Sequence, residues 1–127
     1  MTESPRATVE RKSDAPRYVS TRAFASVVGV PPADLSRWRR RGPVWVPGPD
    51  VTLGTTARPG WDAEIPKDWT RDARPYARPD PVSYWDLTEM QRRHGGMRGE
   101  EIWLCLMDGT LRWPDIWVDE RPGWLPR

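Results

Sequence analysis

The sequence predicts an α+β protein, mostly helical with short β-hairpins, that is made of two small tandem domains. Three observations lead to this prediction. Fifteen prolines and ten glycines divide the 127 residues into short elements. Nine tryptophans can each anchor a small apolar core. The letters RPGW occur twice, at 58–61 and at 121–124, and two copies of so long a unit indicate a duplicated domain rather than a repeat array.

The two copies carry the same landmarks in the same order. The first repeat (residues 18–61) begins at Tyr18, and the second repeat (residues 84–124) begins at Tyr84. Composition separates the remaining segments, because polar stretches of mixed charge tend to be disordered and proline-rich stretches are stiff. The predicted division is a disordered arm at 1–17, a first domain at 18–70, a proline-rich linker at 71–83 and a second domain at 84–127.

Two helices are predicted at the start of the first repeat. Ser20 can cap a helix over 21–28, which Gly29 ends. Pro32 suits the first position of a second helix over 33–41. The Gly-Pro pair that follows stops this second helix.

A short β-hairpin, or wing, is predicted next. Its first strand is the run VTLG at 51–54, and it closes at Trp61. Asp62 can cap one further short helix, in which Ile65 and Trp69 lie four residues apart on one face.

The second repeat is predicted to contain the same elements. Asp86 and Glu89 form a capping-box-like pair for its first helix, which Gly95 ends. In its second predicted helix, Ile102 occupies the position that Leu35 has in the first repeat.

The order of helix, short turn, basic helix and wing is that of a winged helix-turn-helix. The stretch VSTRAFASVVGV at 19–30 resembles the first helix and turn of excisionase-type and MerR-like DNA-binding domains of actinobacteria and their phages. The stretch LSRWRRRG at 35–42 resembles their recognition helix. The resemblance extends more loosely over 85–124, and a Pro-Pro pair replaces the small polar residue that usually opens the recognition helix. It implies two tandem winged helix-turn-helix domains and a double-stranded DNA partner.

The helix over 33–41 has a basic outer face. At about 100° per residue, Leu35 and Trp38 face the core and most of the arginines point away from it. Residues 18–45 contain five arginines and one aspartate, a net charge of +4. Arginine binds phosphate oxygens and can make two hydrogen bonds to guanine, so we predict that this helix enters the major groove. The residues predicted to contact DNA are Ser36, Arg37, Arg39, Arg40 and Arg41 of this helix, together with Arg22 and, near the wing tip, Arg58.

The matching helix of the second repeat has an acidic and apolar outer face. Residues 84–124 contain five arginines and eight acidic residues, a net charge of −3, which DNA phosphates would repel. An exposed cluster of large apolar residues is typical of a protein contact. We therefore expect Trp103, Leu104 and Met107 to form an interface with the first domain, with a second copy in a homo-oligomer, or with another protein.

Other classes of function have little support in the sequence. Cys105 is the single cysteine and His94 the single histidine, so we expect neither a disulfide nor a metal site. A cytoplasmic location follows, with association to the nucleoid when the protein is bound to DNA. No apolar run approaches the roughly 18 residues that span a membrane. Catalytic and phosphate-cradling motifs are missing, so we expect no enzyme activity, no cofactor and no small-molecule substrate.

Several biological roles remain open at this point. The first hypothesis is sequence-specific DNA binding, either as a transcriptional regulator or as an excisionase-like recombination directionality factor. The second is a protein-interaction adaptor or antirepressor that acts through the apolar outer face of the second domain. The third is a phage structural or assembly protein that uses the same small fold.

Overall fold

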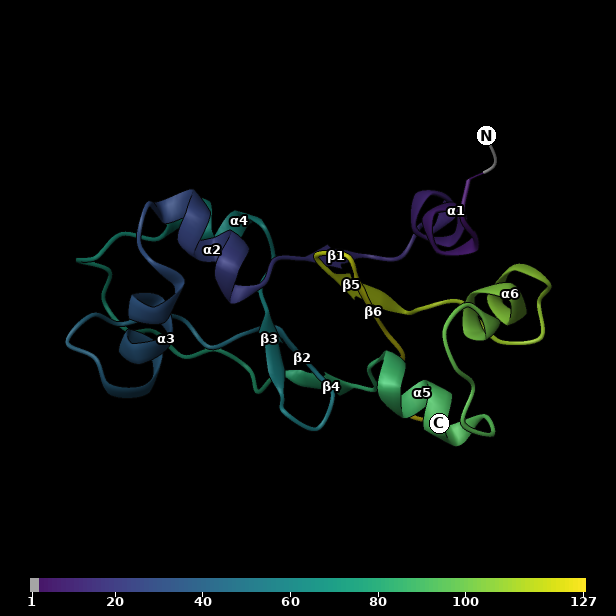
Figure 1. Ribbon diagram of the computed structural model, residues 1–127. Helices are drawn as coiled ribbons and strands as arrows, with labels where there is room; N and C mark the ends of the chain where they lie inside the picture. Colours follow the sequence, from purple (N-terminus) through teal and green to yellow (C-terminus); the bar gives the residue numbers. More distant parts are fainter. Residues whose placement is uncertain (1–2) are drawn as a thin grey trace.

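The computed structural model describes residues 3–127, and within them it is a small α+β fold with six helices and two three-stranded sheets. The helices are α1 (Pro5–Lys12), α2 (Thr21–Val28), α3 (Pro32–Arg41), α4 (Glu64–Asp68), α5 (Leu87–Arg93) and α6 (Glu101–Met107). The strands are β1 (Arg17–Tyr18), β2 (Val51–Leu53), β3 (Arg58–Gly60), β4 (Val82–Tyr84), β5 (Ile116–Val118) and β6 (Arg121–Gly123). Figure 1 shows α2, α3 and α4 at one end, α1, α5 and α6 at the other, and the sheets between them.

The helices of the first repeat begin and end where local chemistry predicts. The Ser20 hydroxyl caps α2 by accepting a hydrogen bond from the backbone N–H of Ala23 at 3.2 Å. Gly29 ends α2 in the left-handed conformation, with φ of 75°. Helix α3 starts at Pro32, whose fixed φ suits a first turn, and ends before Gly42. The first predicted helix is confirmed, and α3 is one residue longer than predicted.

The helices of the second repeat are shorter. Asp86 caps α5 by accepting a hydrogen bond from the backbone N–H of Glu89 at 2.9 Å, as the capping pair predicts. Helix α5 ends at Arg93, one residue before the C-cap His94, and Gly95 follows with φ of 81°. In α6, Ile102 is fully buried, as its match to the first repeat predicts.

Each repeat closes on an antiparallel hairpin, β2–β3 in the first and β5–β6 in the second. The indole N–H of Trp61 donates to the carbonyl of Pro47 at 2.8 Å, and that of Trp124 donates to the carbonyl of Arg112 at 2.9 Å. Both tryptophans are fully buried. The tryptophans of the two RPGW copies therefore occupy equivalent positions at the ends of the hairpins. In each, the apolar ring is buried and the indole N–H is hydrogen-bonded.

Each hairpin completes its sheet with a strand from the other repeat. Strand β1 precedes α2 but pairs in parallel with β5, which places Tyr18 beside Val118. Strand β4 precedes α5 but pairs in parallel with β2, which places Tyr84 beside Leu53. The two repeats therefore share both sheets.

The buried apolar residues form three cores. One lies between the two sheets, where Val51 and Leu53 of β2 cluster with Ile116 and Val118 of β5. The other two lie at the helical ends, one around Phe24, Leu35, Trp61 and Trp69, and one around Met90, Ile102, Leu106, Trp117 and Trp124.

The N-terminal arm contains helix α1, so the prediction of disorder is wrong for residues 5–12, while residues 1–2 of that arm lie outside the described part. Val9 on α1 is fully buried and belongs to the core around α6. The sequence gives little sign of this helix, because it has almost no amphipathic pattern and the residues of α6 that cluster with Val9 lie more than 90 residues from it. Its stability comes from tertiary packing rather than from local propensity.

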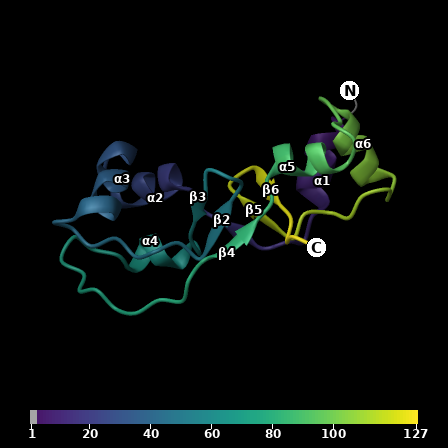
Figure 2. The same cartoon turned by 90° about the horizontal axis from the view of Figure 1, so that it is seen from below.

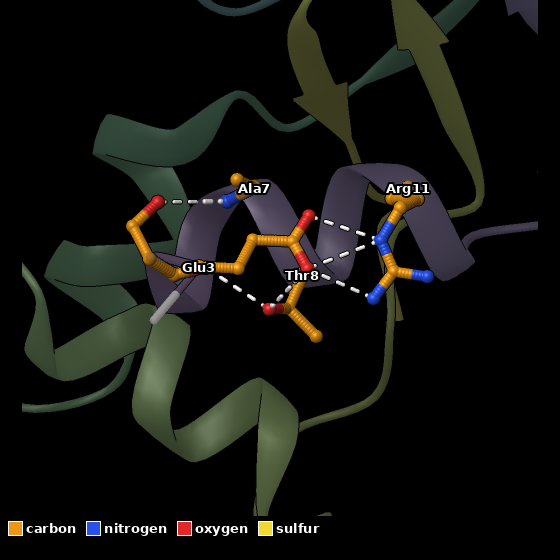
Figure 3. A network of polar contacts seen from close by, with 5 residues as sticks. Glu3, Ala7, Thr8 and Arg11 are labelled. Carbon is orange, nitrogen blue, oxygen red and sulfur yellow. Dashed lines mark hydrogen bonds and ion pairs between the residues drawn. The ribbon is translucent and has the colours of Figure 1, made fainter. Parts of the chain in front are cut away.

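Polar contacts join the segment before α1 to the helix, as Figure 3 shows. The carboxylate of Glu3 accepts hydrogen bonds from Arg11 at 2.8 Å and from the Thr8 hydroxyl at 3.3 Å. The Ser4 hydroxyl accepts from the backbone N–H of Ala7 at 3.1 Å and caps the helix. Glu3 therefore ties the segment before α1 to its last turn.

The predicted linker lies along the first repeat. Arg78 forms an ion pair with Asp50 at 2.6 Å, and the ring of Tyr76 packs edge-on against Trp45 with centroids 4.8 Å apart. Its last two residues, 82–83, belong to β4. Ile65 of the short helix α4 and Trp69, the residue that follows this helix, belong to the core around Phe24, as their spacing predicts.

Candidate nucleic-acid interface

Helix α3 has one face fixed in the core. Leu35 is 1% exposed, and the ring of Trp38 stacks on that of Trp69 with centroids 6.5 Å apart. Phe24 of α2 makes edge-to-face contacts with Trp61 and Trp69, at 5.1 and 5.9 Å between centroids. Since aromatic pairs of this geometry are mutually stabilising, the orientation of α3 about its own axis is well determined.

The opposite face of α3 is exposed and basic. Arg37, Arg40 and Arg41 are exposed. Arg37 pairs with Asp34 one turn earlier at 3.1 Å, but its side chain stays 61% exposed. Arg40 and Arg41 make no ion pair with any carboxylate in residues 3–127. Two uncompensated guanidinium groups on one helix face are available to an anionic partner.

Ser36 and Arg39 are the other two residues of α3 that are predicted to contact DNA. Ser36 is half-buried. The guanidinium of Arg39 lies 5.7 Å from the centroid of the Trp61 ring, within cation–π range. Burial lowers the pKa of Arg39 from its usual value, and the charge of Arg40 adds to that effect. Arg39 is exposed like Arg37, Arg40 and Arg41, but it is the arginine of α3 whose guanidinium lies against the ring of Trp61.

Arg22 and Arg58 come together in a groove, which we call the hairpin groove. It has a volume of about 610 Å³ and lies between the first turn of α2 and the turns of the two hairpins. Its lining residues are Ser20, Thr21, Arg22, Ala23, Ser26, Leu53, Arg58, Pro59, Val118, Asp119, Glu120 and Arg121. The predicted contacts thus form two clusters, one on the outer face of α3 and one in this groove.

Arg121 was not among the residues predicted to contact DNA, although it lines the same groove as Arg58. A signal for it was present in the RPGW repeat, because Arg121 holds the position in the second copy that Arg58 holds in the first. A second, smaller groove of about 280 Å³ lies beside the start of α5 and is lined by Arg58 and Arg121 together with Arg6. The exchange of strands between the repeats creates this arrangement.

The corresponding surface of the second repeat differs from the expectation in one respect. Trp103 is only 3% exposed, so its predicted place on the outer surface is wrong. Helix α1 packs against α6, and the guanidinium of Arg6 lies 5.3 Å from the centroid of the Trp103 ring. Leu104 and Met107 are exposed, at 53% and 48%. Helix α1 thus covers the flank of α6 at Trp103, which was predicted to be part of the outer face.

The remaining chemistry of the described chain is sparse. Residues 3–127 contain no group of three or more histidine, cysteine, aspartate or glutamate side chains placed to hold a metal ion. Cys105 is a half-buried free thiol on α6. Every helix in the described residues is too short or too polar to cross a lipid bilayer.

Comparison with known proteins gives no relative, since no protein-family model, curated protein sequence or solved structure matches this chain.

Proposed function

We propose that this protein is a cytoplasmic, sequence-specific DNA-binding protein in which α3 of the first repeat enters the major groove of double-stranded DNA. The observation that carries the proposal is the outer face of α3, where Arg37, Arg40 and Arg41 are exposed while Leu35 and Trp38 hold the other face in the core. A major groove about 12 Å wide admits a helix of this kind, and arginine can bind both guanine edges and phosphates.

The order of elements supports the same proposal. Helix α2, a short turn, α3 and the β2–β3 hairpin follow one another in the first repeat, and α2 packs directly on α3. This is the order of a winged helix-turn-helix, in which the second helix reads the groove and the first crosses the backbone. We propose that the repeats are a tandem pair of such units related to the excisionase-type and MerR-like class. Transcriptional regulation and recombination directionality are both roles for such a protein.

Only the first repeat is proposed to read bases. The outer face of α6 carries Leu104, Met107 and Asp108 where α3 carries Arg37, Arg40 and Arg41. Helix α1 also covers the flank of α6 at Trp103. An acidic, apolar helix with a second helix along its side is unsuited to a groove lined by phosphates.

A titration of labelled duplex DNA at two salt concentrations tests the proposal. Binding that depends on arginine–phosphate contacts is expected to weaken steeply between about 50 and 200 mM salt. Selection of bound duplexes from a random pool then gives the length and symmetry of the site, and therefore the number of protein copies on it. Absence of binding at low salt, or affinity that does not change with salt, would contradict the proposal.

A second candidate function, protein association, rests on Leu104 and Met107. These side chains lie three residues apart on one helix, where they are neighbours, and each is about half exposed. We propose that they contribute to a contact with a second copy or another protein. Light scattering on the protein and on a Leu104→Ser/Met107→Ser variant tests self-association. The variant should be smaller in solution, and equal masses for both would contradict a contact between copies.

A further inference from the structure

We propose that the second repeat also contacts the DNA backbone, through Arg121 of its own hairpin. This inference rests on the proposed function of α3. Arg121 is exposed on β6 and lines the hairpin groove together with Arg22 and Arg58 of the first repeat. Figure 2 shows both hairpins between the helical ends of the molecule, and residues of each hairpin line this groove.

The position of Arg121 is fixed by the exchanged sheets. In the two hairpins, Arg58 pairs with Leu53, and Arg121 pairs with Val118. Leu53 and Val118 are both in the core between the sheets. The two arginines therefore flank a common buried core and emerge at the same groove.

The arginines of this groove are not balanced by ion pairs. Arg22, Arg58 and Arg121 make none with any carboxylate in residues 3–127. The carboxylate of Asp119 is engaged by Ser20, whose hydroxyl donates at 2.5 Å and whose backbone N–H donates at 3.1 Å. Glu120 is the one carboxylate lining the groove that makes no hydrogen bond or ion pair among the described residues.

Arginines also line the smaller groove beside the start of α5. Arg6 lines it with Arg58 and Arg121, and its guanidinium donates to the backbone carbonyl of Glu120 at 3.1 Å rather than to a carboxylate. Asp86, which also lines it, is engaged in capping α5. Three arginines and two carboxylates thus line this groove, and Glu120 is the carboxylate without a hydrogen bond or ion pair among the described residues.

A phosphodiester backbone is the partner that this surface fits. Across the two grooves four arginines (Arg6, Arg22, Arg58 and Arg121) outnumber three carboxylates (Asp86, Asp119 and Glu120). An excess of positive charge attracts an anionic polymer, and the first helix of a helix-turn-helix unit crosses the DNA backbone. The hairpin groove begins at the first turn of α2, which packs on α3. DNA bound to α3 would then extend over Arg22 and Arg58 to Arg121. The second repeat would therefore lengthen the surface that contacts DNA, although the net charge of this repeat is negative.

The test compares Arg121→Ala with Arg98→Ala, an exposed arginine of the same repeat that lines neither groove. Each neutralised phosphate contributes about 0.9 to the slope of log affinity against log salt. Arg121→Ala should lower that slope by about one unit, and it should weaken binding equally for selected and unrelated duplexes. Arg98→Ala should match the natural protein, and Glu120→Gln should bind more tightly.

The outcomes separate this inference from the proposed function. If the natural protein binds DNA and Arg121→Ala has the same affinity and slope as Arg98→Ala, the contact by the second repeat is refuted while the role of α3 stands. Loss of affinity for one selected sequence alone would also refute it, because that result indicates a base contact. A natural protein that binds no duplex would refute both proposals.

Discussion

Gly60 of the first repeat lies so close to Val118 of the second that a β-carbon on Gly60 would be 2.9 Å from the Cγ2 atom of Val118. It would also be 2.8 Å from Cγ2 of Val51. The equivalent Gly123 has the same restriction, with Leu53 Cδ1 at 2.7 Å. A side chain at the glycine of either RPGW copy would therefore press into the core between the two sheets.

Gly60→Ala should destabilise the whole protein. Forcing a methyl group into a packed core costs about 1–3 kcal/mol, and this core joins both repeats, so we expect one cooperative unfolding transition at lower denaturant concentration. Gly48→Ala is the matched control, because a β-carbon there meets nothing within 4 Å. Chemical denaturation followed by tryptophan fluorescence measures both. Equal midpoints for the two variants would show that the sheets tolerate the methyl group.

Val9→Ala should lower the free energy of unfolding, because Val9 packs in the core of the second repeat. Val9 is fully buried against α6, and loss of its methyl groups should cost about 1–3 kcal/mol. Val27→Ala, at a residue that is 56% exposed on α2, should change stability by about 0.5 kcal/mol or less. Thermal or chemical unfolding measures the difference. An unchanged Val9→Ala protein would mean that α1 does not pack on α6 in solution.

Acid should weaken the protein partly through Glu89. Hydrogen bonds from Arg92 and, next, from Arg93 lower the pKa of this carboxyl below its usual value of 4.5. Because the folded pKa is the lower one, Glu89 stabilises the fold above the usual value, and that contribution is lost as pH falls through the folded pKa.

Glu89→Gln should therefore lose less stability than the natural protein between about pH 5 and about pH 3. Urea denaturation at several pH values measures the two slopes. Identical slopes would show that this carboxyl has the same pKa in the folded and unfolded chains.

The sequence predicts the local features of this fold well. The caps by Ser20 and Asp86, the end of α2 at Gly29 and the buried face of α3 depend on residues a few positions apart. Such features follow from helix geometry and from side chains that bond the nearest backbone groups.

The long-range features escaped prediction for a physical reason. Strands β1 and β4 are two and three residues long, too short for an alternating pattern, and each pairs with the opposite repeat. The burial of Trp103 depends on α1, whose place on α6 is set by contacts about 100 residues apart. The groove that unites Arg58 with Arg121 is a consequence of the same exchange.

DNA binding through the basic face of α3 can be tested by a comparison of two triple variants. One replaces Arg37, Arg40 and Arg41 with alanine, and the other replaces Arg74, Arg98 and Arg127. Both remove three exposed arginines, so the net charge is the same. Duplex affinity measured by fluorescence anisotropy at low and high salt should be lost in the α3 variant and nearly kept in the other. An α3 variant that stays folded and binds as tightly as the matched control would contradict DNA binding through α3.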